Sequence, residues 1–358
     1  MDSGINVGII GLGNVPSGLI QGLEYYKKQP SRKINSIVDK SEYNLDDIKV
    51  GCVFDIDRRK VGEKLEKAVF AEPNLVRWMK LPKSNIIVKQ GPRFDSIGKY
   101  VKNTIECVKE KSTAILEKEI VKEIELTNTN ILINCLPVGS KKVTEFWAKV
   151  ALKTKCAFIN TIPVFIASNK IWERRFLSAN VPIIGDDIKG TLGATILHRN
   201  IARLIDSRGA RLINTYQLNV GGNTDFKNML ERERLLNKKE SKTQSVQSQL
   251  VRPLDTKNIH IGPSDFIEFL GNTKIAYMYF YGTMWADLPY KIDLKLEVND
   301  KANAAGILAD AIRLAKISLD RNMGGCINEP SAYLMKHPPI QLSDEEAKQA
   351  LINFITNK

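Results

Sequence analysis

Strand-like and helix-like patterns of hydrophobic and polar residues alternate along the first half of the chain. Residues 5–13, INVGIIGLG, are an apolar strand that runs into glycine, and Leu19, Ile20, Leu23 and Tyr26 then follow with helical spacing. Four more apolar strands are predicted at 50–54, 130–137, 157–163 and 181–185. Strands that alternate with helices are typical of a parallel, doubly wound sheet, so the pattern predicts an α/β fold with a Rossmann-type domain.

The pattern changes after residue 210. A strand at 211–221 leads into a polar, Gly-rich loop, and two more strands are predicted at 275–285 and 290–298. Tyr277, Tyr279 and Tyr281 alternate with smaller or apolar residues, which is typical of a two-faced strand in an antiparallel sheet.

These patterns predict two domains. Residues 1–191 and a C-terminal return, 302–358, are expected to form the doubly wound domain. Residues 192–301 are expected to form an inserted α+β domain.

Two stretches are hard to assign. Residues 100–120 are predicted to be a lysine-rich crossover helix with an apolar stripe and no chemistry. Residues 231–250 are interpreted as too polar for a core and locally mobile. Within that segment, Lys238 and Lys242 are one helical turn apart, so both lie on one face of a helix. They could belong to a solvent-exposed surface, or they could bind a phosphate together.

Composition narrows the class of protein. The 358 residues include 53 Lys and Arg against 40 Asp and Glu, a net charge of +13 that favours anionic partners. With 43% hydrophobic and 26% charged residues, the chain is an ordinary globular protein rather than a disordered one. No apolar run reaches the length of a membrane span, and the N-terminal residues lack the pattern of a secretory signal, so a cytoplasmic protein is expected. The five scattered cysteines indicate reduced thiols, and the three histidines lack metal-ligand spacing, so no metal ligand is predicted.

The first strand ends in a turn that is typical of dinucleotide binding. Gly11 allows the tight turn, Gly13 allows close backbone approach, and Pro16 suits the first turn of the following helix. The turn residues Asn14 and Val15 would present their amides to a pyrophosphate. The alternative is a tight turn that binds no ligand.

The ribose of a dinucleotide is expected to meet an acidic residue after the second strand. Asp55 and Asp57 both qualify, and we favour Asp57 because it lies past the apolar stretch. An acidic group here favours NAD over NADP, although both aspartates could instead cap a following helix. The distance from the glycine turn is about twice the usual ~20 residues, so residues 29–48 are predicted to loop out.

Other strand ends carry polar or small residues at the edge where open α/β sheets bind ligands. Pro137 and Thr161 lie at two of these ends and are assigned to the cofactor site. Asp186 and Asp187 lie at a third, where they could cap a helix, bind a nicotinamide amide or assist proton transfer.

Seven motifs then occur in an order that resembles the myo-inositol-1-phosphate synthases, particularly their shorter archaeal form. They are GLGN near the start, GDDIKG with GATILHR at 185–199, QLNVGGNTDFKNM at 217–229, KESKT at 239–243, HIGPSDF at 260–266, LKLEVNDKANAAG at 294–306 and SAYLMKHPP at 331–339. The resemblance extends over nearly the whole chain and is densest from 185 to 339.

The resemblance implies an isomerase that converts D-glucose 6-phosphate to 1L-myo-inositol 1-phosphate, the same compound as 1D-myo-inositol 3-phosphate. Carbon 5 is oxidised with NAD, an enolate at carbon 6 attacks the aldehyde at carbon 1, and carbon 5 is reduced again. NAD would be tightly bound and regenerated, and the product would enter inositol and phospholipid biosynthesis. The resemblance also implies a cytoplasmic homotetramer formed through the inserted domain, a monovalent or divalent cation near the phosphate, and no nucleic-acid or membrane partner.

Site residues follow from the same resemblance. The catalytic set is Lys238, Lys242, Lys274, Lys336, Asp187, Asp225 and Asp300. The substrate-binding set is Asn219, Asn223, Gly190 and Thr191. Lys242 and the backbone around Gly190 and Thr191 are expected to hold the phosphate, and the other lysines to stabilise developing oxyanions or carry a proton. The segment 231–250 is expected to close over the substrate.

The chain departs from the family at Gly190, where serine is common, and at Val220, where an aromatic residue is common. A related substrate is therefore one alternative. The others are a net dehydrogenase or cyclase of a sugar or cyclitol phosphate, and a basic nucleic-acid-binding module. The even scatter of Lys and Arg along the chain argues against the last.

Overall fold

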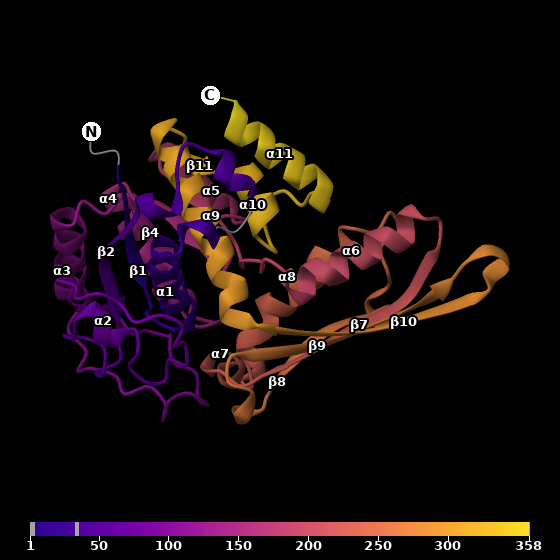
Figure 1. Cartoon of the computed structure of the whole chain (residues 1–358), viewed down its shortest axis with the longest axis horizontal. Coiled ribbons are helices and arrows are strands. Elements are labelled where there is room, and N and C mark those ends of the chain that lie inside the picture. The colour runs from indigo at the N-terminus through magenta and orange to yellow at the C-terminus, as the bar shows by residue number, and fades with distance from the viewer. Residues whose placement is uncertain (1–3, 33–35, 358) are drawn as a thin grey trace.

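The computed structural model describes residues 4–32 and 36–357, without the side chains of 235, 236, 238, 239 and 263. Figure 1 shows an α/β unit that contains both chain ends, from which a long sheet extends to one side. Residues 194–299 form this extension, and helix α9 (Asp300–Asp320) brings the chain back into the α/β unit.

The α/β unit is built on a seven-stranded parallel sheet, which confirms the predicted fold class. Its strand order is β3-β2-β1-β4-β5-β6-β11, with all neighbours parallel. The strands are β1 (Ile5–Ile10), β2 (Ile48–Asp55), β3 (Lys89–Gln90), β4 (Ile131–Asn134), β5 (Ala157–Asn160), β6 (Pro182–Ile184) and β11 (Gly325–Cys326). The chain reverses direction across the sheet between β1 and β4, the place where doubly wound sheets bind ligands.

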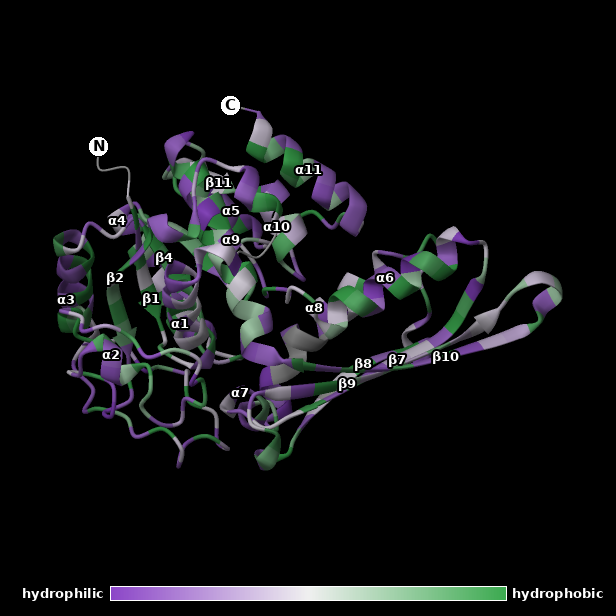
Figure 2. Cartoon of the chain, in the orientation of Figure 1, coloured by the Kyte–Doolittle hydropathy of each residue, from purple (hydrophilic) through white to green (hydrophobic). Residues whose placement is uncertain are grey.

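Helices cover both faces of this sheet because successive strand residues point to opposite sides. Ile131 and Ile133 pack with α1 and α9 in one core, whereas Leu132 packs with α3 and α4 in the other. Figure 2 shows hydrophobic residues in β1 and β2 and a mixture of hydrophobic and hydrophilic residues along the surrounding helices. The helices of this unit are α1 (Asn14–Lys28), α2 (Leu65–Ala68), α3 (Thr113–Leu126), α4 (Lys141–Thr154), α5 (Lys170–Ser178), α9, α10 (Asn328–Leu334) and α11 (Asp344–Thr356).

The insertion between α1 and β2 loops out, as predicted. It contains three short 3₁₀ helices, η1 (Pro30–Arg32), η2 (Ile37–Lys40) and η3 (Leu45–Asp47). The segment is tied to α9 because the Ser36 hydroxyl donates to Asp310 at 2.8 Å and Arg313 pairs with Asp39 at 2.7 Å.

The extension is a four-stranded sheet in the order β10-β9-β7-β8. Its strands are β7 (Arg211–Gly221), β8 (Ile259–Phe266), β9 (Thr273–Thr283) and β10 (Pro289–Asn299). Strand β9 is antiparallel to both neighbours, as the alternating tyrosines predicted. The sheet as a whole is mixed, however, because β8 runs parallel to β7.

One face of this sheet is covered and the other is open. Ala276, Met278 and Phe280 of β9 pack beneath α6 (Ala194–Ser207) and α8 (Leu236–Gln247). On the opposite face, Tyr277 is 45% exposed and Leu218 is 42% exposed. The remaining elements are α7 (Thr224–Asn228), η4 (Arg232–Leu235), η5 (Thr256–Asn258), η6 (Glu268–Leu270) and η7 (Trp285–Asp287).

Two predicted helices do not form as expected. Residues 100–112 contain turns and a bridge, and α3 begins only at Thr113. Residues 101–105 form only a single turn, in which the Ile105 amide donates to the Val101 carbonyl at 3.1 Å. The chain then bonds to the extension of β2, since the Val108 amide donates to the Ile56 carbonyl at 2.9 Å. The residues after Asp57 also form turns rather than a helix, and Gly62 adopts φ +90° there.

The interpretation of residues 231–250 as too polar for a core was wrong. In helix α8 the side chains of Ser241, Ser245 and Val246 are fully buried. The serines are accommodated because Ser241 donates to Asp187 at 2.7 Å and Ser245 accepts from Arg199 at 2.9 Å. Polar residues can therefore be buried here, since each finds a charged partner.

Candidate active site

The turn between β1 and α1 forms part of the wall of a cavity that lies between the two sheets. Gly11 adopts φ +84°, and a Cβ there would lie 3.1 Å from the Cys135 carbonyl oxygen. Open space surrounds the equivalent position of Gly13, so a ligand can approach its backbone. Gly11, Gly13, Asn14 and Val15 all line the cavity, as do Pro137 and Thr161 from neighbouring strand ends.

The acidic residue at the end of β2 that lines the cavity is Asp55, not the predicted Asp57. The Asp55 carboxylate accepts from the amides of Leu12 at 2.7 Å and Ile56 at 2.7 Å. Asp57 is buried in an ion pair with Arg59 and is absent from the cavity wall. The apolar stretch of the sequence could not locate the end of the strand to within two residues.

Asp186 and Asp187 have different surroundings. Asp186 is fully buried and accepts from Asn160 at 2.6 Å and from the amides of Ile166, Ala167 and Ser168 at 3.1 Å. Burial raises the pKa of Asp186 to about 6, although these hydrogen bonds oppose the rise. Asp186 therefore holds the loop 166–168 and does not reach the cavity, whereas Asp187 does.

Asp187 forms a charged group with residues from two distant segments. Its carboxylate accepts from the Lys336 ammonium at 2.9 Å and from the Ser241 hydroxyl at 2.7 Å. Lys336 also donates to the Ile188 carbonyl at 2.5 Å. The segment after β6, helix α8 and the segment after α10 thus meet at one side of the cavity.

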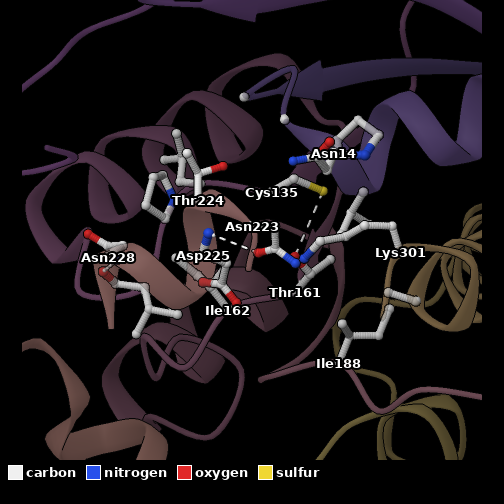
Figure 3. A pocket seen from close by; sticks show the side chains of 18 of the residues that line it. Asn14, Cys135, Thr161, Ile162, Ile188, Asn223, Thr224, Asp225, Asn228 and Lys301 are labelled. Atoms are coloured by element: carbon white, nitrogen blue, oxygen red, sulfur yellow. Dashed lines mark hydrogen bonds between the residues drawn. The ribbon is translucent and has the colours of Figure 1, made fainter. Parts of the chain in front are cut away.

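A second charged group lies where β10 passes into α9. Asp300 pairs with the Lys301 ammonium at 2.8 Å and with the Lys274 ammonium at 3.5 Å. Asp225 lies close enough for its charge to raise the pKa of Lys301. All four side chains line the cavity, and Figure 3 shows Asp225 and Lys301 with Asn14 and Thr161.

The third group is at the N-terminus of α6. Gly190, Gly193 and Thr195 line the cavity together with Lys242 from α8. A Cβ on Gly190 would lie 2.6 Å from the Asn303 amide nitrogen, so the close approach of Asn303 explains glycine at this position. Thr191 is exposed, bonds to the Asn303 carbonyl at 2.9 Å and does not line the cavity.

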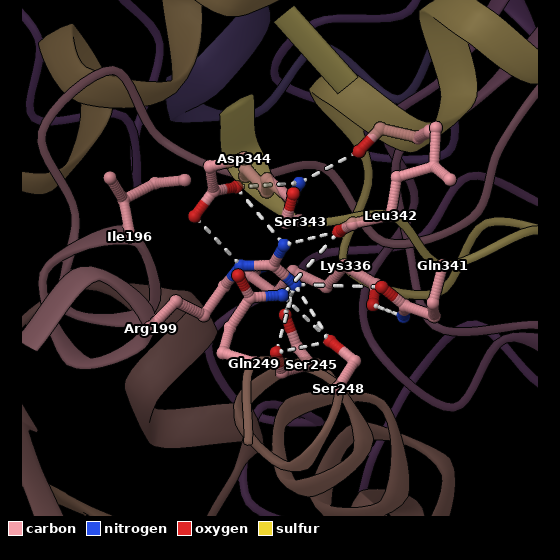
Figure 4. A network of polar contacts seen from close by, with 12 residues as sticks. Ile196, Arg199, Ser245, Ser248, Gln249, Lys336, Gln341, Leu342, Ser343 and Asp344 are labelled. Carbon is pink, nitrogen blue, oxygen red and sulfur yellow. Dashed lines mark hydrogen bonds and ion pairs between the residues drawn. The ribbon is translucent and has the colours of Figure 1, made fainter. Parts of the chain in front are cut away.

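A buried arginine of α6 joins this helix to α8 and to the segment before α11 (Figure 4). Arg199 of α6 is fully buried and pairs with Asp344 at 3.0 Å, while it donates to the Ser245 carbonyl at 2.8 Å. Lys189, which lines the cavity, lies 3.7 Å from the same carboxylate. Burial lowers the pKa of Lys189 to about 7, and the neighbouring Arg199 contributes to this shift.

The cavity measures about 290 Å³ and brings together most of the predicted site residues. Asn223 lines it, but Asn219 and Val220 on β7 do not. Lys238 lies in α8, and its side chain is outside the described part of the structure. Four residues on the cavity wall were not predicted as site residues: Asp55, Lys189, Asn228 and Lys301. Only Asp55 could have been recognised from the sequence, where it was the alternative to Asp57 as the ribose ligand.

Within residues 4–32 and 36–357, no group of three or more His, Cys, Asp or Glu side chains has the arrangement of a metal site. Over the same residues, no helix combines the length and hydrophobicity needed to cross a membrane.

Fold and site together define the class: a doubly wound α/β protein in which a dinucleotide-type turn and a lysine-rich pocket share one cavity. A sequence model of the myo-inositol-1-phosphate synthase family matches residues 193–301. Inositol-3-phosphate synthases from Mycobacterium tuberculosis and Corynebacterium glutamicum are each 44% identical to the chain. The alignment with the M. tuberculosis protein covers 98% of this chain and 95% of that relative. The alignment with the C. glutamicum protein covers 99% of this chain and 98% of that relative.

A solved structure has the same fold. The myo-inositol-1-phosphate synthase-related protein from Thermotoga maritima superimposes with a TM-score of 0.81 at 23% identity, over 97% of both chains. The chain belongs to the myo-inositol-1-phosphate synthase family, whose members are isomerases.

Proposed function

We propose that this enzyme converts D-glucose 6-phosphate to 1D-myo-inositol 3-phosphate with NAD as a regenerated cofactor. One observation carries the proposal: the dinucleotide-type turn and three ammonium groups, those of Lys242, Lys274 and Lys336, line a single cavity. Such a site can hold a cofactor, a phosphate and a developing oxyanion at the same time. The family membership supports the same reaction.

The cavity has the groups that NAD requires. The turn at Gly11 and Gly13 and the N-terminus of α1 would hold the pyrophosphate, and Asp55 would bind the adenosine ribose. At the other side, the Asn223 amide nitrogen and the Asn228 amide oxygen have no hydrogen-bond partner in the described part of the chain. These buried polar atoms can bind the nicotinamide end or a substrate hydroxyl. When bound, NAD would accept hydride from carbon 5 and return it.

The role of Asp55 can be separated from that of Asp57. Asp55→Asn weakens NAD binding by about tenfold, because a charge-assisted hydrogen bond is worth about 1.5–3 kcal/mol. Asp57→Asn changes the affinity by less than about threefold, since Asp57 faces Arg59 rather than the cavity. Isothermal titration of both variants with NAD measures the difference. The reverse order of effects would restore Asp57 as the ribose ligand.

The substrate phosphate is assigned to the N-terminus of α6. Gly193 and Ala194 at the start of α6 line the cavity, and the positive end of a helix of this length attracts an anion. Lys242 adds a positive charge from α8, and the Thr195 hydroxyl lies at the same end. Thr195 would thus supply a hydroxyl to the phosphate. Gly190, at a position where serine is common in the family, has no hydroxyl to supply.

Ring closure needs groups that stabilise negative oxygen and move protons. Lys336 and Lys274 are suited to this because Asp187 and Asp300 hold each ammonium in place at the cavity wall. An ammonium can stabilise the enolate oxygen and then the new alkoxide at carbon 1, and can donate a proton to it. Helix α8 contributes Lys242 to the cavity wall and would help to keep water from the reactive intermediate.

We also propose the two-domain division at 191/192 and 301/302, and a homotetramer built through the open face of the long sheet. Tyr216, Leu218 and Tyr277 are exposed on that face, and the β9–β10 hairpin carries the 91% exposed Trp285. Exposed apolar surface of this kind is typical of a subunit interface.

The interface has a direct test. Combined Leu218→Glu and Tyr277→Glu substitutions reduce the mass in solution from four chains to two or one, because buried unpaired carboxylates are costly. Light scattering after size exclusion measures the mass, with Lys149→Glu on the exposed side of α4 as the control. A double variant that keeps the mass of four chains would exclude this face.

A net dehydrogenase of a sugar phosphate is the competing function. Absorbance at 340 nm during turnover distinguishes the two, because a net dehydrogenase builds up NADH in step with product. The proposed isomerase consumes glucose 6-phosphate with no NADH accumulation. A stoichiometric rise in NADH would replace the proposal with the dehydrogenase.

A further inference from the structure

Lys301 is a buried cation in the active-site cavity that the site prediction did not include. Its side chain is 5% exposed, and its ammonium lies 2.8 Å from one carboxylate oxygen of Asp300. The Lys274 ammonium lies 3.5 Å from the other oxygen. The charges of Asp300 and Asp225 raise the pKa of Lys301 against the effect of burial, so the group stays protonated.

The position of Lys301 is unfavourable for a purely structural residue. It is the second residue of α9, a 21-residue helix, where the positive end of the helix dipole repels a cation. Asn299 already caps this helix by accepting from the amides of Lys301 at 3.2 Å and Ala302 at 3.0 Å. A buried lysine also needs a negatively charged partner to compensate its charge, whereas a neutral residue at the same position would need none. The charge therefore has a use other than stabilising α9.

A bound metal or monovalent ion does not fit this part of the cavity. Hard cations require several oxygen ligands, which here would come from Asp225 and Asp300. The Lys301 ammonium already contacts one Asp300 oxygen, and Lys274 lies against the other. Among the described residues, no cluster of three or more carboxylate, imidazole or thiol side chains provides another site.

We propose that Lys301 is a built-in cation that occupies the place of a dissociable ion in the active site, so that turnover requires no added cation. Lys301 acts as a positioning residue: it fixes the Asp300 carboxylate opposite Lys274 and supplies positive charge to the cavity that Asn14 of the dinucleotide turn also lines (Figure 3). This inference rests on the proposed function.

The test compares wild type with Lys301→Ala in tetramethylammonium buffer that contains a chelator and no K⁺, NH₄⁺ or divalent ion. Wild type forms inositol phosphate at its full rate there, and added ions change that rate by less than about twofold. Lys301→Ala loses about 100-fold in rate, and NH₄⁺ or methylammonium restores at least about tenfold, because either ion can enter the space of the missing ammonium. Lys149→Ala, an exposed lysine on α4, is the matched control and behaves as wild type.

A second readout does not depend on turnover. Crystals of Lys301→Ala soaked in rubidium chloride give an anomalous peak beside Asp300, and wild-type crystals give none. Wild type that needs K⁺ or a divalent ion, a variant that stays active without ions, or rubidium beside Asp300 in wild type would each overturn the proposal. If wild type forms no inositol phosphate in any buffer, the proposed function fails, while the rubidium result still tests Lys301.

Discussion

Replacing Lys336 by Met lowers kcat for inositol phosphate formation by about 10²- to 10³-fold, the usual loss when one oxyanion-stabilising donor is removed. Methionine keeps the length of the side chain but removes the ammonium that lies 2.9 Å from Asp187. Because the phosphate is assigned to Lys242 and the N-terminus of α6, KM for glucose 6-phosphate changes by less than about threefold.

Steady-state kinetics with product quantified after quenching measures both constants. NAD affinity serves as the internal control for folding, and Lys149→Met is the matched lysine substitution on the surface. Full turnover by Lys336→Met would remove Lys336 from the catalytic set. A large rise in KM with unchanged kcat would instead place Lys336 at the phosphate.

The largest effect on stability is expected for Arg199→Met, which costs about 3 kcal/mol or more, because it breaks a buried ion pair and leaves several acceptors without a donor. Arg199 contacts Asp344 at 3.0 Å, the Ser245 carbonyl at 2.8 Å and the Leu342 carbonyl at 3.0 Å. These contacts join α6 to α8 and to the segment before α11, so the variant also loosens the helix that carries Lys242.

Two measurements check this result. The melting temperature falls by about 5 °C or more, and limited proteolysis cleaves the variant within residues 231–250 faster than wild type. Arg203→Met, one turn further along α6 at an exposed position, is the control and changes neither. An unchanged melting temperature in Arg199→Met would show that the network adds no net stability.

The parallel sheet and its glycine turn were predictable because their signals are local. A mostly apolar strand, Gly11 and the helical spacing after it suffice for the β1–α1 unit. The family resemblance also predicted Lys242, Lys274 and Lys336 as site residues, two of them within the seven motifs and Lys274 between two of them. All three line the cavity in the structure.

Tertiary contacts explain what the sequence could not predict. Asp55 and Asp57 differ by two residues, and the end of β2 depends on its pairing with β1 and β3. Residues 101–108 have helical spacing, but the helix stops after one turn because Val108 bonds to the β2 extension. Val101 and Ile105 lie on the cavity wall.

Buried polar residues were the main omission. Lys189 and Lys301 resemble ordinary surface lysines in sequence, because their burial and their ion pairs with Asp344 and Asp300 depend on the fold. Helix α8 looked too polar to be buried for the same reason. Its serines face Arg199 and Asp187, which come from other segments.

The most direct test of the central claim is whether the product is a closed ring. The purified enzyme is incubated with glucose 6-phosphate and catalytic NAD, and the mixture is then treated with borohydride, which reduces aldoses but not inositol phosphates. The proposed function predicts a phosphate ester that survives this treatment as inositol phosphate, in amounts far above the NAD supplied. Recovery of only glucitol 6-phosphate, from an enzyme that binds NAD, would contradict it.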